Sequence, residues 1–524
     1  MINFFNKRFF ILFIFPIILG GISVFSFQPF NLFLINFFSL PCLFWLILYV
    51  SKKSKSTYRK KPFLKNLFFL GTSYGFGFFF FSLYWIIYSM TFDDAFKIFI
   101  PFGLILIPLF LSLFFSIPII LTGRLIEANI SSIILISLLF GLGDFCRSII
   151  LTGFPWNLWI YSFSSIIENL QLLDKLGFFF LNQILITLLF LPAALFFKNF
   201  NKFSVLGFIV FILFSNYFYG SYKINSSKKN ENYENKLINF KIVTAGLNLS
   251  EFRYPIDVAL KLIKLSEPKP EVKTIFIWPE GTFMSEYFTN IKKDKKIVSL
   301  FKKNFSKNHL IILGASTTKQ LDNEVKYFNS LLVVDNELNI ISQYDKRKLV
   351  PFGEFLPFES FLSKFGLKKI TPGYTSFSKG EGKSIIEFQF NNIILKLLPL
   401  ICYEIIFSNL VENDISGSNL IINISEDAWF GKSIGPHQHF AKAVFRSIES
   451  RKFVIRSANK GKSVFIDPNG QMIKSLEPVE AGNIELQLPI IESSNIKIKK
   501  SLIFYLLLIT YVFIFFVLRK FKIK

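Results

Sequence analysis

Long apolar runs are the feature that most constrains how this chain can fold. A helix needs about 20 apolar residues to cross the hydrocarbon core of a bilayer. Eight runs of that order occur in the 524 residues, seven before residue 220 and one near the C-terminus. We expect spanning helices over residues 9–27, 32–50, 67–90, 98–121, 130–150, 176–197, 203–219 and 502–518. No small-residue cleavage site follows the first run, so we expect a retained helix rather than a signal peptide.

Basic side chains lie beside these apolar runs. The formal net charge is +24, which in a soluble protein would suggest nucleic-acid binding. Here lysine and arginine gather in the loop 51–65 and in the tail 519–524. Such segments stay on the cytoplasmic side of a membrane. We therefore predict both chain ends in the cytoplasm, residues 223–499 outside it, and no nucleic-acid partner.

The middle of the chain reads as a water-exposed domain. A polar linker is expected over 221–236, between the helices of 1–220 and a domain of 237–499, and the last helix and its tail occupy 500–524. Strands are expected over 240–245, 274–278, 310–314, 329–334, 340–344, 385–390, 393–398 and 420–424, with a hairpin turn at 467–470 before another strand. Helices are expected over 251–265, 292–303, 404–409 and 439–450. This alternation predicts an α/β domain with helices covering sheets.

Three segments of this domain carry groups suited to catalysis. Glu280 follows the apolar run 275–278 and precedes a glycine, so it is either a solvated acid or a general base at a strand end. Lys346 follows Tyr344 in a stretch that continues to Glu354, with Pro351 and Gly353 restricting the backbone there. That stretch is either a basic surface loop or a source of positive charge and an acid–base group.

The third segment contains Cys402, Tyr403 and Glu404. Cys402 is the only cysteine of the middle domain, because Cys42 and Cys146 fall in apolar runs. It is either a buried structural cysteine or a nucleophile. The change from an apolar strand to a polar, helical segment favours the nucleophile, because a helix N-terminus stabilises a thiolate.

Together, in the order Glu280, Lys346, Cys402, these segments resemble the nitrilase, or carbon–nitrogen hydrolase, superfamily. With the membrane helices, the resemblance narrows to the bacterial apolipoprotein N-acyltransferase family. Further matching segments are GFPWN at 153–157, KLVPFGEF at 348–355, EDAWFG at 426–431, GPHQH at 435–439 and RSAN at 456–459. The sequence departs from the family pattern after Asn459, where Lys460 and Lys462 flank Gly461.

The resemblance implies a polytopic helical membrane domain joined to an αββα sandwich. It implies Glu280 as base, Lys346 as catalytic lysine and Cys402 as nucleophile, supported by Glu354, Tyr403 and Glu404. A phospholipid would donate its acyl chain through a thioester, and the acceptor would be the amine of diacylglyceryl-cysteine in an apolipoprotein. The location would be the bacterial inner membrane, with the catalytic domain in the periplasm. No cofactor or metal is expected; His437 and His439 are too few ligands for a confident site.

Three other functions are considered. A membrane-tethered amidase would use the same triad, with water resolving the thioester. A transporter would carry ionisable groups within its helices. Asp144 and Arg147 are the main such pair here, and we expect them to pair structurally on one helical face. A catalytically inactive scaffold is disfavoured by the intact triad.

Overall fold

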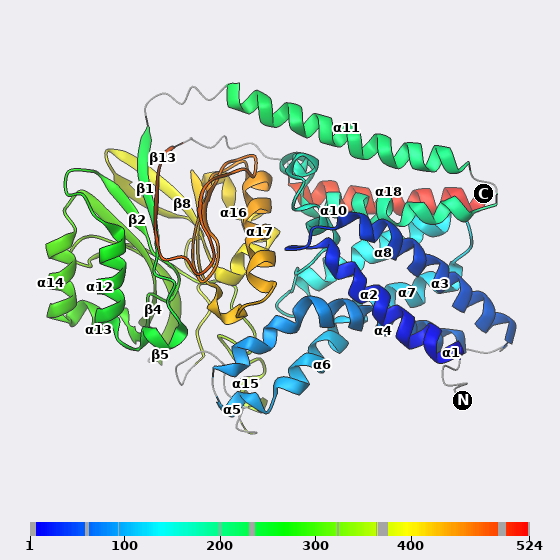
Figure 1. Cartoon of the computed structure of the whole chain (residues 1–524), viewed down its shortest axis with the longest axis horizontal. Coiled ribbons are helices and arrows are strands. Elements are labelled where there is room, and N and C mark those ends of the chain that lie inside the picture. The colour runs from blue at the N-terminus through cyan, green and yellow to red at the C-terminus, as the bar shows by residue number, and fades with distance from the viewer. Residues whose placement is uncertain are drawn as a thin grey trace. The chain divides into compact units, whose positions relative to one another are not determined.

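The chain forms two compact units. A computed structural model describes residues 7–57, 62–92, 94–198, 201–229, 236–321, 324–362, 364, 376–490 and 499–521 (Figure 1). The first unit comprises residues 1–228 and 498–524, and the second comprises residues 229–497. Each unit is described by itself.

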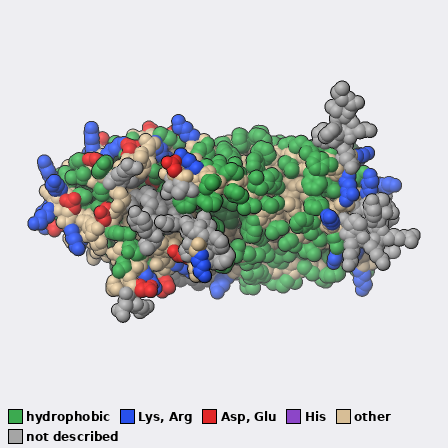
Figure 2. All heavy atoms as spheres, turned by 90° about the horizontal axis from the view of Figure 1, so that it is seen from below, with side chains coloured by type: hydrophobic (Ala, Val, Ile, Leu, Met, Phe, Trp, Pro, Cys, Tyr) green, Lys and Arg blue, Asp and Glu red, His purple; other side chains and the backbone are tan. Residues whose placement is uncertain are grey.

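The regular secondary structure among the described residues of the first unit is all helical. Among them, eight helical stretches are long and apolar enough to cross a membrane, which confirms the prediction of about eight spanning helices. These stretches are Lys7–Ser26, Phe33–Lys53, Phe63–Thr91, Ile100–Leu125, Ile130–Ile149, Phe178–Phe196, Lys202–Ser227 and Lys500–Lys520. Hydrophobic side chains cover this unit in a broad band, and lysine and arginine side chains gather at one end of it (Figure 2).

Several of these stretches contain more than one helix. Pro41 lies inside α3 and Pro118 inside α7, and Pro108 lies near the end of α6, next to the break at Ser112. The α-helices of this unit are α1 (Lys7–Phe9), α2 (Phe15–Ser23), α3 (Asn36–Thr57), α4 (Pro62–Leu83), α5 (Asp94–Lys97), α6 (Ile100–Leu111), α7 (Leu113–Leu125), α8 (Ile130–Ile149), α9 (Leu173–Leu176), α10 (Phe178–Phe190), α11 (Lys202–Lys229) and α18 (Lys500–Lys520).

A buried ion pair lies on α8. Arg147 Nη2 donates to Asp144 Oδ1 at 3.0 Å, which confirms the predicted pairing on one helical face. Asn182 Nδ2 of α10 donates to the other oxygen of Asp144 at 2.9 Å. Arg147 also donates to the carbonyls of Phe154 and Trp156. The pair therefore ties α8 to α10 and to the loop that carries the GFPWN segment.

Helix α11 continues into the stretch predicted as a linker. It ends at Lys229, so residues 221–229 are helical, and residues 230–235 of the predicted linker lie outside the described residues. The division of the chain into domains at these boundaries stays a prediction.

The second unit contains two sheets. The first has the strand order β13-β1-β2-β4-β5-β6, with β3 paired to β4, and the second has the order β12-β11-β10-β9-β8-β7. The strands of the first sheet are β1 (Leu237–Thr244), β2 (Thr274–Ile277), β3 (Phe283–Tyr287), β4 (His309–Leu321), β5 (Glu324–Val334), β6 (Ile340–Asp345) and β13 (Gly482–Pro489). Those of the second are β7 (Ile386–Phe390), β8 (Ile393–Ile401), β9 (Leu420–Glu426), β10 (Val454–Asn459), β11 (Ser463–Ile466) and β12 (Met472–Leu476).

The sheets pack face to face with helices outside them. One core contains side chains from both sheets, among them Ile242, Ile277, Leu397 and Ile422. The outer face of the first sheet is covered by α12 (Pro255–Ser266), α13 (Phe288–Lys293) and α14 (Lys295–Asn304). Helices α16 (Ser408–Asp414) and α17 (Gly435–Ser450) lie beside the second sheet (Figure 1). This layering is the αββα sandwich that the resemblance implied.

All eight predicted strand ranges coincide with strands of the structure, but one predicted helix is wrong. Residues 404–409 were expected to be helical from Glu404 onward. Instead a short 3-10 helix covers Cys402–Ile406, and α16 begins only at Ser408. Strands β3, β10 and β13 were not predicted.

Candidate active site

The strand order brings Glu280 and Lys346 to the same edge of the first sheet. Strand β2 runs parallel to β4, and β4, β5 and β6 are successively antiparallel, so β6 also runs parallel to β2. Glu280 follows β2 and Lys346 follows β6. Gly314 of β4 allows the Glu280 loop to approach, because a Cβ there would lie 2.6 Å from the Cα of Glu280.

Lys346 lies between two carboxylates. Its Nζ is 3.0 Å from Glu354 Oε1 and 3.3 Å from Glu280 Oε1, and all three side chains are buried. Burial lowers the pKa of Lys346, but the charges of Glu280 and Glu354 outweigh that effect and raise it above its ordinary value. The lysine is therefore a fixed positive charge and not a proton carrier at neutral pH.

Asn329 of β5 also binds both carboxylates. Its Nδ2 donates to Glu280 Oε1 at 2.8 Å and to Glu354 Oε1 at 2.7 Å. The amide thus shares both oxygens with Lys346 and holds two like charges near one cation. Sequence reasoning missed this residue, because an asparagine within a strand has no distinctive pattern.

Glu354 is held by its own loop, as the prolines and glycine around it predicted. Its backbone N–H donates to the carbonyl of Val350, and the N–H of Val350 donates to Glu354 Oε2, both at 2.9 Å. Phe352 has a φ of 62° in this loop. Closed on itself in this way, the loop presents Glu354 Oε1 to the lysine.

Cys402 directly follows β8 and has a left-handed backbone, with a φ of 48°. A non-glycine residue in this conformation costs on the order of 1–2 kcal/mol, so its surroundings must hold it there. The thiol is buried. Burial raises its pKa well above the ordinary value, the charge of Glu280 raises it further, and Lys346 opposes both. The expectation of a stabilised thiolate is therefore wrong for the resting protein, because burial and the charge of Glu280 outweigh the charge of Lys346.

Glu404 links the backbone beside Cys402 to the loop that carries Lys346. Its Oε1 accepts from the N–H of Arg347 at 2.7 Å, the N–H of Lys348 at 3.0 Å and Tyr344 Oη at 2.9 Å. Its Oε2 accepts from the N–H of Ile401 at 2.9 Å. Since these donors flank Lys346 on one sheet and Cys402 on the other, Glu404 fixes the separation of the two.

Tyr403 is buried and packs its ring edge-on against Phe407, with centroids 5.1 Å apart. Burial raises its pKa above the ordinary value, so the phenol is neutral at physiological pH.

The carboxyl ends of β9 and β10 complete this edge. The N–H of Glu426 donates to Glu280 Oε2 at 3.0 Å, which places the second sheet against the Glu280 carboxylate. Asn459 Nδ2 donates to the carboxylate of Glu426 and to the carbonyl of Leu247. After Asn459, Lys462 forms an ion pair with Glu477 at 2.9 Å, so this departure from the family pattern is accommodated at the surface.

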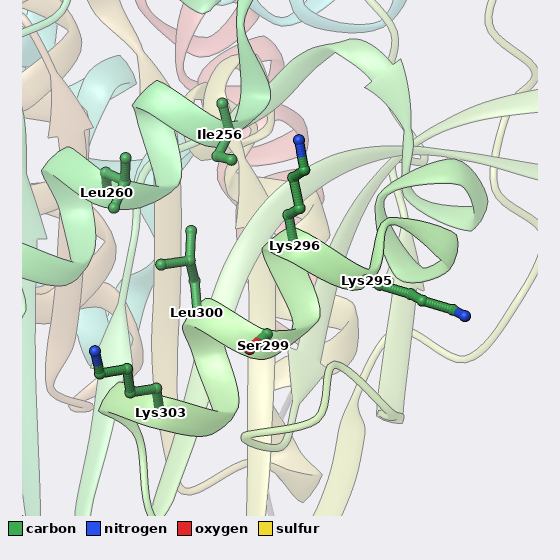
Figure 3. Close-up of a pocket in the computed structure, with 7 residues that line it drawn as sticks. All are labelled: Ile256, Leu260, Lys295, Lys296, Ser299, Leu300 and Lys303. Carbon is green, nitrogen blue, oxygen red and sulfur yellow. The ribbon is translucent and has the colours of Figure 1, made fainter.

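The second unit also has an open pocket that is separate from these groups. It lies between α12 and α14 and contains none of the predicted catalytic residues (Figure 3). Its lining consists of Ile256, Leu260, Lys295, Lys296, Ser299, Leu300 and Lys303.

A sandwich with an acid, a lysine and a cysteine at one edge, on a chain with eight apolar helices, defines a membrane-associated protein of the nitrilase type. Comparison with known families agrees. Residues 270–493 match the carbon-nitrogen hydrolase family, and residues 19–191 match the apolipoprotein N-acyltransferase N-terminal domain.

Individual relatives narrow the family. The apolipoprotein N-acyltransferase of Rickettsia prowazekii is 30% identical over 90% of this chain and 91% of its own length. That of Allorhizobium ampelinum is 29% identical over 87% of this chain and 86% of its own length. Nit3 of Saccharomyces cerevisiae, a nitrilase-superfamily structure, is 17% identical over 48% of this chain and 90% of its own, with a TM-score of 0.34.

The chain belongs to the apolipoprotein N-acyltransferase family. It is a multi-pass membrane enzyme that transfers acyl groups to amines in lipoprotein biosynthesis.

Proposed function

We propose that the enzyme takes an acyl chain from a membrane phospholipid and transfers it to the N-terminal amine of diacylglyceryl-cysteine in an apolipoprotein. Glu280, Lys346 and Cys402 carry the chemistry, supported by Glu354, Tyr403 and Glu404. The observation that carries this proposal is the buried group of Glu280, Lys346 and Glu354, in which the charges of Glu280 and Lys346 act on the thiol of Cys402.

The first half-reaction forms a thioester. Because the resting thiol is neutral, Glu280 accepts its proton as the sulfur attacks the ester carbonyl of the lipid. The developing oxyanion lies near the charge of Lys346, which needs no reorganisation to stabilise it. The C–O bond then breaks, Glu280 returns the proton to the departing alkoxide, and a lysophospholipid leaves.

The second half-reaction uses the same groups in reverse. The amine of the acceptor attacks the thioester carbonyl, and Glu280 accepts a proton from the amine nitrogen. The C–S bond breaks, the sulfur regains a proton, and an amide is formed. Splitting one transfer into two steps in this way is the advantage of a covalent intermediate.

We further propose that the enzyme lies in the bacterial inner membrane, with residues 237–499 as a periplasmic catalytic domain between the helices of 1–220 and the helix of 500–524. The basic loop 51–65 and the basic tail support cytoplasmic ends. In the helical unit, lysine and arginine side chains gather at the end where α1 begins and α18 ends (Figures 1 and 2).

A trapping experiment tests the proposal. The purified full chain is incubated with phospholipid that carries one labelled acyl chain, and Cys402 is analysed by mass spectrometry. We expect one acyl group on Cys402 in the wild type and none in Cys402→Ala, with Cys146→Ala as the matched control that keeps the adduct. Addition of a diacylated lipopeptide should then move the label to its α-amine.

The amidase alternative gives a different result. There, labelled phospholipid leaves Cys402 unmodified, or water releases the label as free fatty acid, and small amides yield ammonia. Either outcome in place of amine acylation would overturn the proposed transfer.

A further inference from the structure

A buried polar cluster lies behind the nucleophile. Four of its side chains, Asn423, Asp427, His439 and Arg456, are fully buried, and none of them belongs to the triad. Arg456 Nη2 donates to Asp427 Oδ2 at 2.7 Å, and Arg456 Nη1 donates to Asn423 Oδ1. The sequence singled out the segments that hold Asp427, His439 and Arg456, but it weighed only His439, as one of too few ligands for a metal site.

This cluster forms hydrogen bonds with the backbone just before Cys402 and at Cys402 itself. Asn423 Nδ2 donates to the carbonyl of Leu400 at 2.7 Å, two residues before the nucleophile. His439 Nε2 is 3.1 Å from the carbonyl oxygen of Cys402 itself. Because a carbonyl oxygen can only accept, Nε2 must carry the hydrogen.

The other ring nitrogen contacts two side chains that hold the ring in place. His439 Nδ1 is 3.3 Å from Arg456 Nη2, which can only donate, and 3.0 Å from Asp427 Oδ1. Asp427 Oδ1 accepts in addition from Ser425 Oγ at 2.7 Å. The ring is also packed edge-on against Phe430, with centroids 5.3 Å apart. His439 therefore has a fixed orientation as well as a fixed donor.

The hydrogen bond to the Cys402 carbonyl sets the direction of the next N–H. In a trans peptide the C=O and N–H groups point to opposite sides. With the Cys402 carbonyl turned toward His439, the N–H of Tyr403 points away from His439. The left-handed backbone at Cys402 needs such an external restraint, because its own preference is for other conformations.

We propose that His439 is a positioning residue that orients the Cys402–Tyr403 peptide, so that the Tyr403 N–H meets the oxyanion of the acyl substrate. This inference rests on the proposed function. In this proposal His439 takes no part in proton transfer, and Asp427 and Arg456 hold its imidazole ring in position.

Substitutions at His439 separate positioning from folding. Glutamine places an N–H₂ about as far from the backbone as Nε2, whereas asparagine is one bond shorter and leucine has no donor. Loss of one oxyanion donor lowers the rate by about 10²–10³-fold. We expect His439→Asn and His439→Leu to slow acylation of Cys402 at saturating phospholipid by at least about 30-fold, with little change in KM. His439→Gln should stay within about fivefold of the wild type.

Alkylation of Cys402 by iodoacetamide distinguishes a positioning role of His439 from a structural one, because a disturbed structure around Cys402 would change the alkylation rate as well. That reaction develops no oxyanion on a carbonyl, so it does not need the Tyr403 N–H. We expect alkylation rates within about threefold of the wild type in all three His439 variants. His437→Asn, two residues earlier on α17 and exposed, is the matched control for both assays.

Three results would overturn the inference while leaving the proposed function intact. One is normal acylation in folded His439→Asn or His439→Leu. Another is a parallel loss of alkylation and acylation, which would indicate a structural role. The third is failure of both variants to fold when His437→Asn folds. If wild-type Cys402 is never acylated, the proposed function itself fails.

Discussion

Replacement of Glu404 by glutamine tests whether one carboxylate holds the Lys346 loop and the backbone at Cys402 in place. The carboxylate accepts four hydrogen bonds, three at Oε1 and one at Oε2. Glutamine has a single acceptor oxygen. If that oxygen takes the place of Oε1, the new N–H₂ faces the N–H of Ile401, and a buried donor loses its partner.

The expected cost follows from these contacts. A hydrogen bond to a charged group contributes about 1.5–3 kcal/mol, and an unsatisfied buried donor costs about 1–3 kcal/mol. These figures overlap, so we expect Glu404→Gln to destabilise the local structure by about 2–4 kcal/mol. A difference of about 1.4 kcal/mol is tenfold in an equilibrium, so about 2 kcal/mol corresponds to roughly 30-fold faster exchange of the restrained amides.

Hydrogen–deuterium exchange on the full chain in detergent measures this directly. Amides of Ile401, Arg347 and Lys348 should exchange faster, and acylation of Cys402 should fall by about 100-fold, because small misplacements of reacting groups are costly. The matched control is Glu387→Gln, whose ion pair with Lys396 spans 3.8 Å between exposed side chains. The reasoning is refuted if Glu404→Gln exchanges and acylates as Glu387→Gln does.

Three further predictions concern the base, its loop and the helical unit. Glu280→Gln removes a charge that raises the pKa of Cys402, so iodoacetamide should alkylate the thiol faster at pH 8 while lipid acylation falls by about 10²–10⁴-fold. In the wild type, the raised pKa of Cys402 means that the alkylation rate keeps rising from pH 7 to 9. A plateau of that rate within this range would contradict the raised pKa. Gly314→Ala should lower the free energy of unfolding by about 1–3 kcal/mol and slow acylation of Cys402. Gly382 has open space around it, so Gly382→Ala should change neither quantity in the same thermal and acylation assays. Arg147→Leu leaves Asp144 buried without its cation and should lower the free energy of unfolding by about 3–5 kcal/mol, measured as a lower melting temperature in detergent. The matched control is Lys97→Leu, which breaks the exposed ion pair of Asp94 and Lys97. Equal melting temperatures of the two variants would contradict the prediction.

The sequence predicted the parts of the fold that depend on apolar periodicity. Runs of spanning length gave the eight helices, and β-branched runs such as those of β2, β4 and β9 gave most of the sandwich. Strand β10 was missed because Arg456, Ser457 and Asn459 interrupt its apolar character. All three are buried and hydrogen-bonded in the structure, which a single-sequence pattern cannot reveal.

The candidate site was predictable in its charged members but not in its geometry. The positions of Glu280, Lys346 and Cys402 at strand ends followed from the pattern, and the structure brings their charges together. Asn329 could not be found this way, because it contacts both carboxylates from within a strand. The left-handed backbone at Cys402 also has no signature, since nothing local favours it in a cysteine.

The neutral, buried state of Cys402 has a consequence for the lifetime of the enzyme. Peroxide oxidation and exchange with disulfides both require the thiolate, as alkylation does. Under the proposed mechanism, Cys402 loses its proton only when a substrate carbonyl is bound. Between turnovers its thiol is therefore a poor target for oxidation and for disulfide exchange. The burial that raises the pKa of Cys402 thus also protects its sulfur from oxidants that would attack a more acidic thiol.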